Sequence, residues 1–343
     1  MSAAGDRTAP APRPATIRHG QDSDAEGFIA LIGGCWAEYP GCVLDLDGEV
    51  PELRALATYF RGQGGTLWAA EREGRLVGMV GTRPLKEDAA WEICRMYVDA
   101  GARGIGLAGD LLRIAEDHAR AAGARRLVLW TDTRFTRAHG FYEKHGYVRQ
   151  GSIRILDDLS HSLEFRYAKP AAGLVVEALD AAAAASAERL LTDLLVTCVA
   201  EGASLEFLPP LPRDRAAAYW KGVSAAVATG QRVLLAAWHE GRLAGSVTIE
   251  MVASENQPHV AGFQKLMVDP AARRAGIGRA LLRRAEQAAR AHGRRLAMLD
   301  TRRGSAAETL YRAEGWNELG AVPGFEVDGD RQPRDTVFFW KAL

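Results

Sequence analysis

Metal-binding and disulfide patterns are missing from this sequence. Only four cysteines occur in 343 residues, with no CxxC spacing and no neighbouring pair of histidines, at Cys35, Cys42, Cys94 and Cys198. Without such patterns the chain offers no zinc ligand set and no disulfide framework. We therefore expect buried free thiols in a reducing compartment and no metal site.

Long apolar segments are missing as well. No hydrophobic run reaches the roughly 18 residues that a membrane-spanning helix needs. The first 16 residues contain three prolines but no hydrophobic stretch, whereas a secretory signal requires one. These absences predict a cytoplasmic protein without membrane contact. Residues 1–15 are expected to form a disordered tail before the first domain.

A surplus of charge of either sign is also lacking, because 43 Lys and Arg balance 43 Asp and Glu. Proteins that bind nucleic acid need extra Lys and Arg for phosphate contacts, so we expect no nucleic-acid partner. What is present is 48% hydrophobic and 25% charged residues, which is typical of a globular chain. At about 150 residues per domain, this length predicts two domains.

The chain contains an internal duplication of domain size. The segment VDAGARGIGLAGDLLRIAEDHARAAG (98–123) aligns without a gap with VDPAARRAGIGRALLRRAEQAARAHG (268–293), at an offset of 170 residues. REGRLVGMV and HEGRLAGSV match upstream, and FYEKHGY and LYRAEGW match downstream, at offsets of 167 and 169. Three blocks in one order indicate two copies of one domain. We predict domains over residues 16–169 and 174–343.

Each copy predicts the same order of elements. Short strands are expected at 16–18 and 174–177, followed by helices, and then strands at 66–70 and 232–237 with a tight E-G-R-L turn. An apolar strand, a glycine loop and a helix of about four turns come next. A buried strand and a short helix with a tyrosine complete each copy. The alanine run at 181–185 is expected to be helical.

The glycine loop between a strand and a helix predicts phosphate binding, because backbone N–H groups and the helix N-terminus attract anions. The first copy contains a formal GxGxxG at Gly104, Gly106 and Gly109, followed by Asp132, so a dinucleotide-binding fold is a rival interpretation. The second copy has Arg274 and Arg279 at the positions of the first and third glycines. The GxGxxG match is therefore accidental, and the shared pattern is Arg-x-x-Gly-x-Gly/Ala.

This loop, with the later (F/L)-Y-x-x-x-G-(Y/W) element, resembles the GNAT superfamily of N-acetyltransferases. The resemblance implies two α+β domains, each a mixed, mostly antiparallel sheet with splayed central strands flanked by helices. It implies acetyl-CoA as cofactor, with its pantetheine arm in the splay. The pyrophosphate would be held by Arg103, Gly104, Ile105, Gly106, Leu107 and Ala108, and by Arg273, Arg274, Ala275, Gly276, Ile277 and Gly278. The pantetheine would pair with Met96, Tyr97 and Val98, and with Leu266, Met267 and Val268.

The second half is similar to tabtoxin-resistance acetyltransferases in the segments GASLEFL, NQPH, QKLMV, LDTRRGSAAETLY and PGF. That similarity implies acetylation of the amine of a small amino-acid-like toxin or antibiotic. The first half shows no such specific likeness.

Acetyl transfer to an amine requires a base and a partner for the leaving thiolate. An amine of pKa about 10.4 is only about one part in 10³ neutral near pH 7.4, a cost of about 4 kcal/mol. Tyr142 and Tyr311 occupy the family position for the thiolate partner, although either can also be a core tyrosine. Asp300 at a strand end is the candidate base of the second copy, with an Asx turn or helix cap as the alternative.

Relatives carry a glutamate where this chain has Gly262, so Glu250, Glu206 and His259 are further candidates for the base. In the first copy Glu92 aligns with Gly262. Thr131 aligns with Asp300, and Asp132 follows it. We therefore expect two different active sites. Aromatic residues before the first hairpin can line acceptor pockets or belong to the core: Trp36, Tyr39, Phe207, Tyr219 and Trp220.

The sequence thus predicts a tandem acetyltransferase that acts on the primary amine of a small molecule. Two alternatives are that the first domain transfers another acyl group, or that one domain is a non-catalytic CoA-binding module. An NAD-dependent enzyme is a remote third. A homodimer is left open.

Overall fold

The computed structural model describes residues 14–86 and 88–343. Of the predicted tail, residues 1–13 lie outside the described part, and Pro14 and Ala15 have no regular structure. Contacts divide the described chain into two compact units, residues 14–135 with 153–164, and residues 136–152 with 165–343. Residues 136–152 and 165–169, which the duplication assigns to the first copy, are thus grouped with the second unit. The domain bounds inferred from the duplication remain a prediction.

The first sheet has the strand order β1-β2-β3-β4-β5-β8-β6, and β7 pairs with β8. Its elements are β1 (Thr16–His19), α1 (Ala25–Trp36), α2 (Leu56–Gly62), β2 (Thr66–Arg72), β3 (Arg75–Pro84), β4 (Ala90–Val98), α3 (Leu107–Ala121), β5 (Arg126–Asp132), α4 (Thr136–Lys144), β6 (Val148–Arg149), β7 (Arg154–Ile155) and β8 (Leu163–Pro170). Short 3-10 turns precede α1, α2 and α3.

The second sheet has the order β14-β15-β13-β12-β11-β10-β9. Its elements are β9 (Leu174–Leu179), α5 (Ala181–Ser186), α6 (Glu188–Ala200), α7 (Arg213–Ala228), β10 (Arg232–His239), β11 (Arg242–Met251), β12 (Val260–Val268), α8 (Ile277–Ala291), β13 (Leu296–Arg302), α9 (Ala306–Ala313), β14 (Asn317–Val327) and β15 (Pro333–Ala342). The alanine run forms α5, as predicted.

Both sheets are mixed and mostly antiparallel. The parallel pairings recorded among the described residues are β4 with β5 and β12 with β13. The predicted α+β class is therefore confirmed. The all-parallel sheet of a dinucleotide-binding fold is not formed, so that rival interpretation is wrong.

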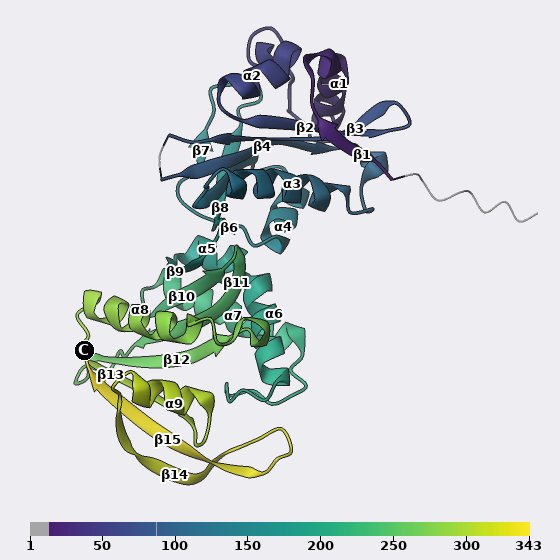
Figure 1. Ribbon diagram of the computed structural model, residues 1–343. Coiled ribbons are helices and arrows are strands. Elements are labelled where there is room, and N and C mark those ends of the chain that lie inside the picture. Colours follow the sequence, from purple (N-terminus) through teal and green to yellow (C-terminus); the bar gives the residue numbers. More distant parts are fainter. Residues whose placement is uncertain (1–13, 87) are drawn as a thin grey trace, which may run out of the picture. The chain divides into compact units, whose positions relative to one another are not determined.

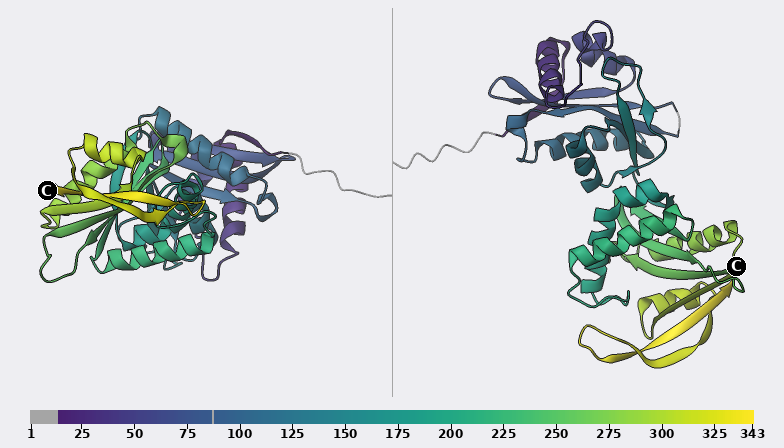
Figure 2. Two further views of the ribbon diagram at one scale, coloured as in Figure 1. Left: turned by 90° about the horizontal axis from the view of Figure 1, so that it is seen from below. Right: turned by 180° about the vertical axis from the view of Figure 1, so that it is seen from behind.

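Helices cover both faces of each sheet (Figures 1 and 2). In β10, Leu234, Ala236 and Trp238 pack against α5, α6 and α7, while Leu235 and Ala237 pack against α8. This alternation follows from the two-residue period of a strand. In the first unit, α1 and α2 pack on one face of β2 and β3, and α3 contacts β3 and β4.

The helix that follows each glycine loop lies very close to its sheet. A Cβ on Gly78 would lie 2.9 Å from Leu111 of α3, and a Cβ on Gly245 would lie 2.9 Å from Leu281 of α8. Only glycine at these duplicated positions admits the helix at this distance. This close packing fixes the N-terminus of each helix beside the end of the preceding strand.

Candidate active site

Each glycine loop ends in a left-handed residue that starts a helix. Gly106 (φ 90°) is the N-cap of α3, and Gly276 (φ 78°) is the N-cap of α8. A Cβ built on either glycine meets no atom within 4 Å, so the space in front of both helix N-termini is open. Gly104 (φ 81°) and its counterpart Arg274 (φ 70°) are also left-handed. The second loop therefore keeps its backbone shape without the first glycine of GxGxxG.

Two aspartates that the sequence analysis did not single out shape these loops. Asp99 accepts a hydrogen bond from the Gly101 backbone N–H (3.0 Å), and Asp269 accepts one from the Ala271 N–H (2.9 Å). Each thereby caps a 3-10 turn that leads into the loop. The Val-Asp pair that begins both repeated segments could have identified these two aspartates from the sequence.

The first arginine of the loop serves as a clamp in the first copy. Arg103 donates from Nε to the Val98 carbonyl (3.0 Å) and binds both carboxylate oxygens of Glu38 (2.6 and 2.7 Å). The side chain thus ties the loop to the chain just after α1. The groups left facing the open space are backbone N–H groups at a helix N-terminus, which suit an anion.

A duplicated cysteine packs behind each loop. Cys35 donates to the Val98 carbonyl (3.6 Å), and Cys198 donates to the Val268 carbonyl (3.5 Å). Burial raises the pKa of both thiols, to about 11 for Cys198. The predicted free, buried thiols are confirmed for these two positions. Because a nucleophilic cysteine needs a thiolate, neither is suited to covalent catalysis.

The central strands diverge in both sheets, as predicted. β12 pairs with β13 only through Val260–Gly262 against Leu296–Met298. β4 pairs with β5 only through Ala90–Glu92 against Arg126–Val128. Beyond these three pairs no ladder joins the strands, so their ends separate beside the glycine loop.

A β-bulge lies at the same place in both diverging strands. The β11–β12 register shifts at Lys265 (φ 53°), and the β3–β4 register shifts at Arg95 (φ 50°). A bulge leaves a residue out of the ladder and turns the strand. The strand ends expected to pair with pantetheine, Met96–Val98 and Leu266–Val268, follow directly after it.

In the second copy, Asp300 and Tyr311 lie on β13 and α9, two elements in contact, and the Asp300 charge acts on the Tyr311 hydroxyl. Asp300 pairs with Phe338 in the middle of a ladder, and Ser305 caps α9 instead, so the alternative of a cap or turn for Asp300 is wrong. The Asp300 carboxylate has no hydrogen bond or ion pair with another described residue. The residue keeps solvent access, yet partial burial of the carboxyl group raises its pKa, helped by the negative charges of Glu206 and Glu326.

Tyr311 is buried, with its ring near Trp316 and Phe339. Its hydroxyl makes no hydrogen bond to any described residue. Burial and the charge of Asp300 raise the pKa of this hydroxyl well above its usual value. Tyr311 therefore remains protonated and can donate a hydrogen bond.

The position aligned with the family's glutamate differs between the copies. In the first copy, Glu92 is buried and binds Arg83 across the strands (Nε–Oε2 2.7 Å). In the second copy, Gly262 faces Glu250, and a Cβ on Gly262 would lie 3.7 Å from a Glu250 carboxylate oxygen. The Glu250 carboxylate accepts a hydrogen bond from Gln264 (2.7 Å) and has no ion pair among the described residues.

The other candidate carboxylate of the first copy is also paired. Asp132 accepts hydrogen bonds from the Arg134 backbone and guanidinium (2.6 to 2.9 Å). Burial alone would raise the pKa of Asp132, but these bonds outweigh it and the pKa is lowered. The neighbouring Thr131 hydroxyl is buried without a hydrogen bond. Tyr142 lies in α4, which belongs to the second contact unit, where its ring packs on Phe141 and Tyr147.

The aromatic candidates divide between core and acceptor side. Trp220 is fully buried and belongs to the core. Trp36 donates to the Tyr97 hydroxyl (3.0 Å). Phe207 and Tyr219 instead flank the ammonium group of Lys265, a residue that the sequence analysis did not select.

The two loops meet the requirements of a cofactor with a pyrophosphate and a pantetheine arm. Backbone donors face open space at each helix N-terminus, and a diverging strand end lies beside each loop. No group of His, Cys, Asp or Glu within residues 14–86 and 88–343 could hold a metal ion. No helix in these same ranges has the length and apolar character to cross a membrane.

Comparisons with known proteins agree with this geometry. The model of the "Acetyltransferase (GNAT) family" matches residues 33–147, and that of the "Acetyltransferase (GNAT) domain" matches residues 230–318. The chain is 32% identical over 141 residues to the uncharacterized N-acetyltransferase YjgM of Escherichia coli, which is 40% of this chain and 84% of the relative. A GCN5-related N-acetyltransferase structure from Kribbella flavida has 21% identity and a TM-score of 0.43, over 50% of this chain and 98% of the other.

The N-acetylaspartate synthetase of Xenopus tropicalis is 35% identical over 107 residues, which is 31% of this chain and 40% of the relative. The chain spans about two-fifths or less of the length of the N-acetylaspartate synthetases it matches. From the tandem family matches and the relative that is covered almost throughout, it follows that this protein belongs to the GNAT family of acetyltransferases and contains two such domains.

Proposed function

We propose that the second half acetylates the primary amine of a small amino-acid-like molecule by direct transfer. The observation that carries this proposal is the pair formed by Asp300 and Tyr311 at the splay, neither of which is engaged by another side chain. The names of the N-acetylaspartate synthetases and the likeness of the second half to tabtoxin-resistance acetyltransferases support an amino-acid-like acceptor.

Bound acetyl-CoA supplies the acetyl thioester, whose sulfur leaves as a thiolate. Asp300 removes a proton from the acceptor ammonium, either directly or through water, and so exposes the nitrogen lone pair. Because the pKa of the Asp300 carboxyl group is raised, it lies closer to the acceptor pKa of about 10.4, and proton transfer from the ammonium is less unfavourable. Attack by the nitrogen forms the amide bond as the carbon–sulfur bond breaks, and the nitrogen gives up its second proton. Tyr311 donates a hydrogen bond to the departing thiolate, which takes up that proton, directly or through water, and ends as the free thiol. Glu250, beside Gly262, is the second candidate for the base.

For the first half we propose a CoA-binding module rather than a second catalyst. Its loop has the same left-handed glycine and open space as the second. Both of its candidate bases are held in ion pairs, Glu92 with Arg83 and Asp132 with Arg134. The hydrogen bonds from Arg134 also lower the pKa of Asp132, which makes this carboxylate a poor proton acceptor. We also propose that the protein works in the cytoplasm, where its four cysteines stay reduced.

Acetyl-CoA turnover with a panel of amino acids and amines tests the function, read out as free thiol. We expect turnover with amino acids, retained in the chain carrying Gly106→Val and lost in the chain carrying Gly276→Val. No thiol release with any amine would overturn the proposal. Loss in the Gly106→Val chain with retention in the other would assign the activity to the first half.

A further inference from the structure

The second unit contains a buried lysine at the start of the splay. The Lys265 side chain is 2% exposed, and the residue lies at the bulge of β12. Burial lowers the pKa of its ammonium group, which the Glu206 carboxylate opposes. A buried ammonium group is costly unless it has a partner, so what binds Lys265 matters.

The partner of Lys265 is an exposed loop residue. Glu206 lies between α6 and α7, and its Oε2 is 2.8 Å from Lys265 Nζ. The Glu206 side chain is 76% exposed, and its backbone is left-handed (φ 63°). A buried cation is thus neutralised by a carboxylate that reaches in from solvent on a loop.

Other polar groups lie around Lys265. The Tyr219 hydroxyl is buried without a partner at good hydrogen-bond geometry, although the Arg232 and Thr248 side chains lie close enough to act on its pKa. Arg232 has no ion pair with a described carboxylate. The Arg232 charge acts on both Lys265 and Tyr219. The ring centres of Phe207 and Tyr219 lie 5.7 and 5.5 Å from Lys265 Nζ. Lys265 is thus held by one exposed counter-ion, with a second cation and a buried phenol beside it.

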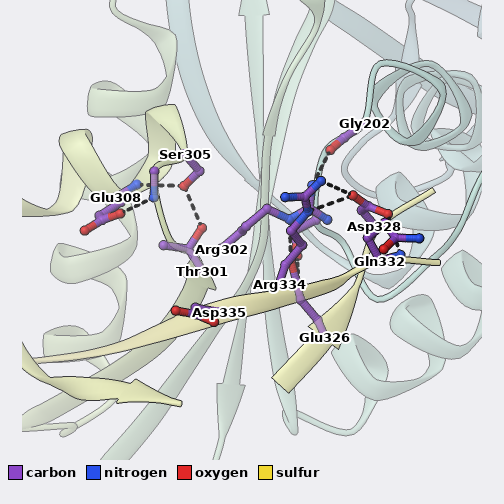
Figure 3. A network of polar contacts seen from close by, with 12 residues as sticks. Gly202, Thr301, Arg302, Ser305, Glu308, Glu326, Asp328, Gln332, Arg334 and Asp335 are labelled. Atoms are coloured by element: carbon purple, nitrogen blue, oxygen red, sulfur yellow. Dashed lines mark hydrogen bonds and ion pairs between the residues drawn. The ribbon is translucent and has the colours of Figure 1, made fainter. Parts of the chain in front are cut away.

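The start of the Glu206 loop is anchored from the β14–β15 hairpin. Glu326 of β14 accepts hydrogen bonds from Ser204 and from Arg302 of β13. Arg302 also donates to the Gly202 carbonyl (3.3 Å). Figure 3 shows Arg302 between Gly202 and Glu326. Leu205 and Phe207, on either side of Glu206, pack on the core of the second unit, so the loop is held in place and the exposed Glu206 side chain alone makes the contact with Lys265.

The matching cation of the first copy is satisfied differently. Arg95, at the equivalent bulge, binds Glu52 (2.6 Å) within the 3-10 turn Pro51–Ala55, and both side chains are about one-fifth exposed. That ion pair joins two ordered elements. The contrast indicates that the exposed counter-ion of Lys265 is not a requirement of the bulge itself.

We propose that Lys265 and Arg232 bind the carboxylate of the acceptor, and that Glu206 occupies this position only until the acceptor arrives. The proposal rests on the function assigned to the second half and specifies its substrates as amines that carry a carboxylate. Asp300 shares this neighbourhood, since its charge acts on both Lys265 and Tyr311. A carboxylate held here would bring the amine of the same molecule toward the base.

Calorimetry on the full chain can test this site without turnover. The probes are N-acetyl-L-leucine and N-acetyl-L-aspartate, with N-isopentylacetamide as the analogue of the first without its carboxylate. We expect the two carboxylates to bind and the amide to bind at least tenfold more weakly. Glu206→Gln should tighten carboxylate binding, because it removes the internal competitor. Lys265→Met should weaken it about 10- to 100-fold, in the range of a charge-assisted hydrogen bond.

Lys221→Met is the matched control, since it removes the same charge from an exposed position on α7, and it should leave carboxylate binding unchanged. The Glu206→Gln variant keeps the test decisive if Lys265→Met fails to fold. Equal binding of N-acetyl-L-leucine and N-isopentylacetamide to the unmodified chain and to Glu206→Gln overturns the proposal, as does no binding of either carboxylate. Carboxylate-selective binding without thiol release from any amine would support this site while the proposed function failed.

Discussion

The two halves share their cofactor loops but differ on the acceptor side. At one cross-strand position the first half has Arg83 opposite Glu92, and the second has Glu250 opposite Gly262. The first half thus neutralises its carboxylate with a guanidinium, whereas the second leaves one without an ion pair. A duplicated domain can therefore keep its cofactor geometry while the charges that would activate an amine are rearranged, because acceptor recognition depends on a few placed polar groups.

Among the variants that test this difference between the halves, Asp300→Asn should have the largest effect on catalysis. Removing a positioned base should lower kcat about 10²- to 10⁴-fold while binding of acetyl-CoA is unchanged. In the unmodified chain, kcat/KM should rise with pH through the raised pKa of Asp300, and the variant should lose this rise. Asp132→Asn is the corresponding change in the first half. Equal losses in both variants would show that both halves are catalytic.

The next largest effect should follow from Tyr311→Phe. We expect kcat to fall roughly 10²-fold, because the leaving sulfur loses its hydrogen-bond donor, with little change in acetyl-CoA affinity. Tyr142→Phe is the counterpart in the first half. Steady-state kinetics combined with a melting temperature separate this effect from unfolding, and a folded Tyr311→Phe variant with unchanged kcat would remove this hydroxyl from the mechanism.

The two glycine loops should bind acetyl-CoA independently, so a substitution in one loop should leave binding by the other unchanged. Valine at Gly106 or Gly276 must adopt a left-handed backbone that costs of order 1–3 kcal/mol, and its side chain would fill the open space in front of the helix. Calorimetry should give about two acetyl-CoA sites per unmodified chain and one in each variant. A stoichiometry of two that survives Gly276→Val would contradict the assignment of this loop.

The smallest expected effect is on the melting temperature. Replacing the candidate carboxylate by an amide should change this temperature in opposite directions in the two halves. Burial raises the pKa of Asp300 in the folded chain, so above that raised pKa its negative charge lowers the stability of the fold. This destabilisation disappears as the pH falls to about 3.9, the pKa of the same carboxyl group in the unfolded chain. Asp300→Asn should therefore raise the melting temperature at pH 7 by an amount that corresponds to no more than about 1 kcal/mol. The pKa of Asp132 is lowered, so Asp132→Asn should lower the melting temperature at pH 7, and the difference should vanish as the pH falls through that lowered pKa. The same sign for both variants would contradict this comparison.

The loops and their helices could be predicted from the sequence because the duplication exposes them. Gly104 of the first copy aligns with Arg274 of the second, so a glycine is not required at that position. Gly106 aligns with Gly276, and this shared glycine is the one that the loop requires. The strand and helix order was equally accessible, since it follows from local hydrophobic periodicity repeated twice.

The acceptor side could not be predicted from the sequence alone. The pairing of Arg83 with Glu92 depends on the register between two strands, and the burial of Lys265 depends on a bulge that reverses which face its side chain occupies. Glu206 reaches Lys265 across more than 50 residues of sequence, from a loop without periodic residues. Neither local propensity nor residue spacing contains this information.

The bulge in β12 has a consequence for the evolution and engineering of this enzyme. A non-glycine residue is held there in a left-handed conformation, which favours replacement by glycine on grounds of backbone energy alone. A library of variants selected only for heat resistance can therefore retain Lys265→Gly, because relief of that strain and removal of a buried ammonium group offset part of the cost of the cavity that it leaves. Such clones would keep the sheet and the cofactor loop and still lose the cation beside the acceptor, so a screen for thermostability needs a parallel screen for turnover at this position.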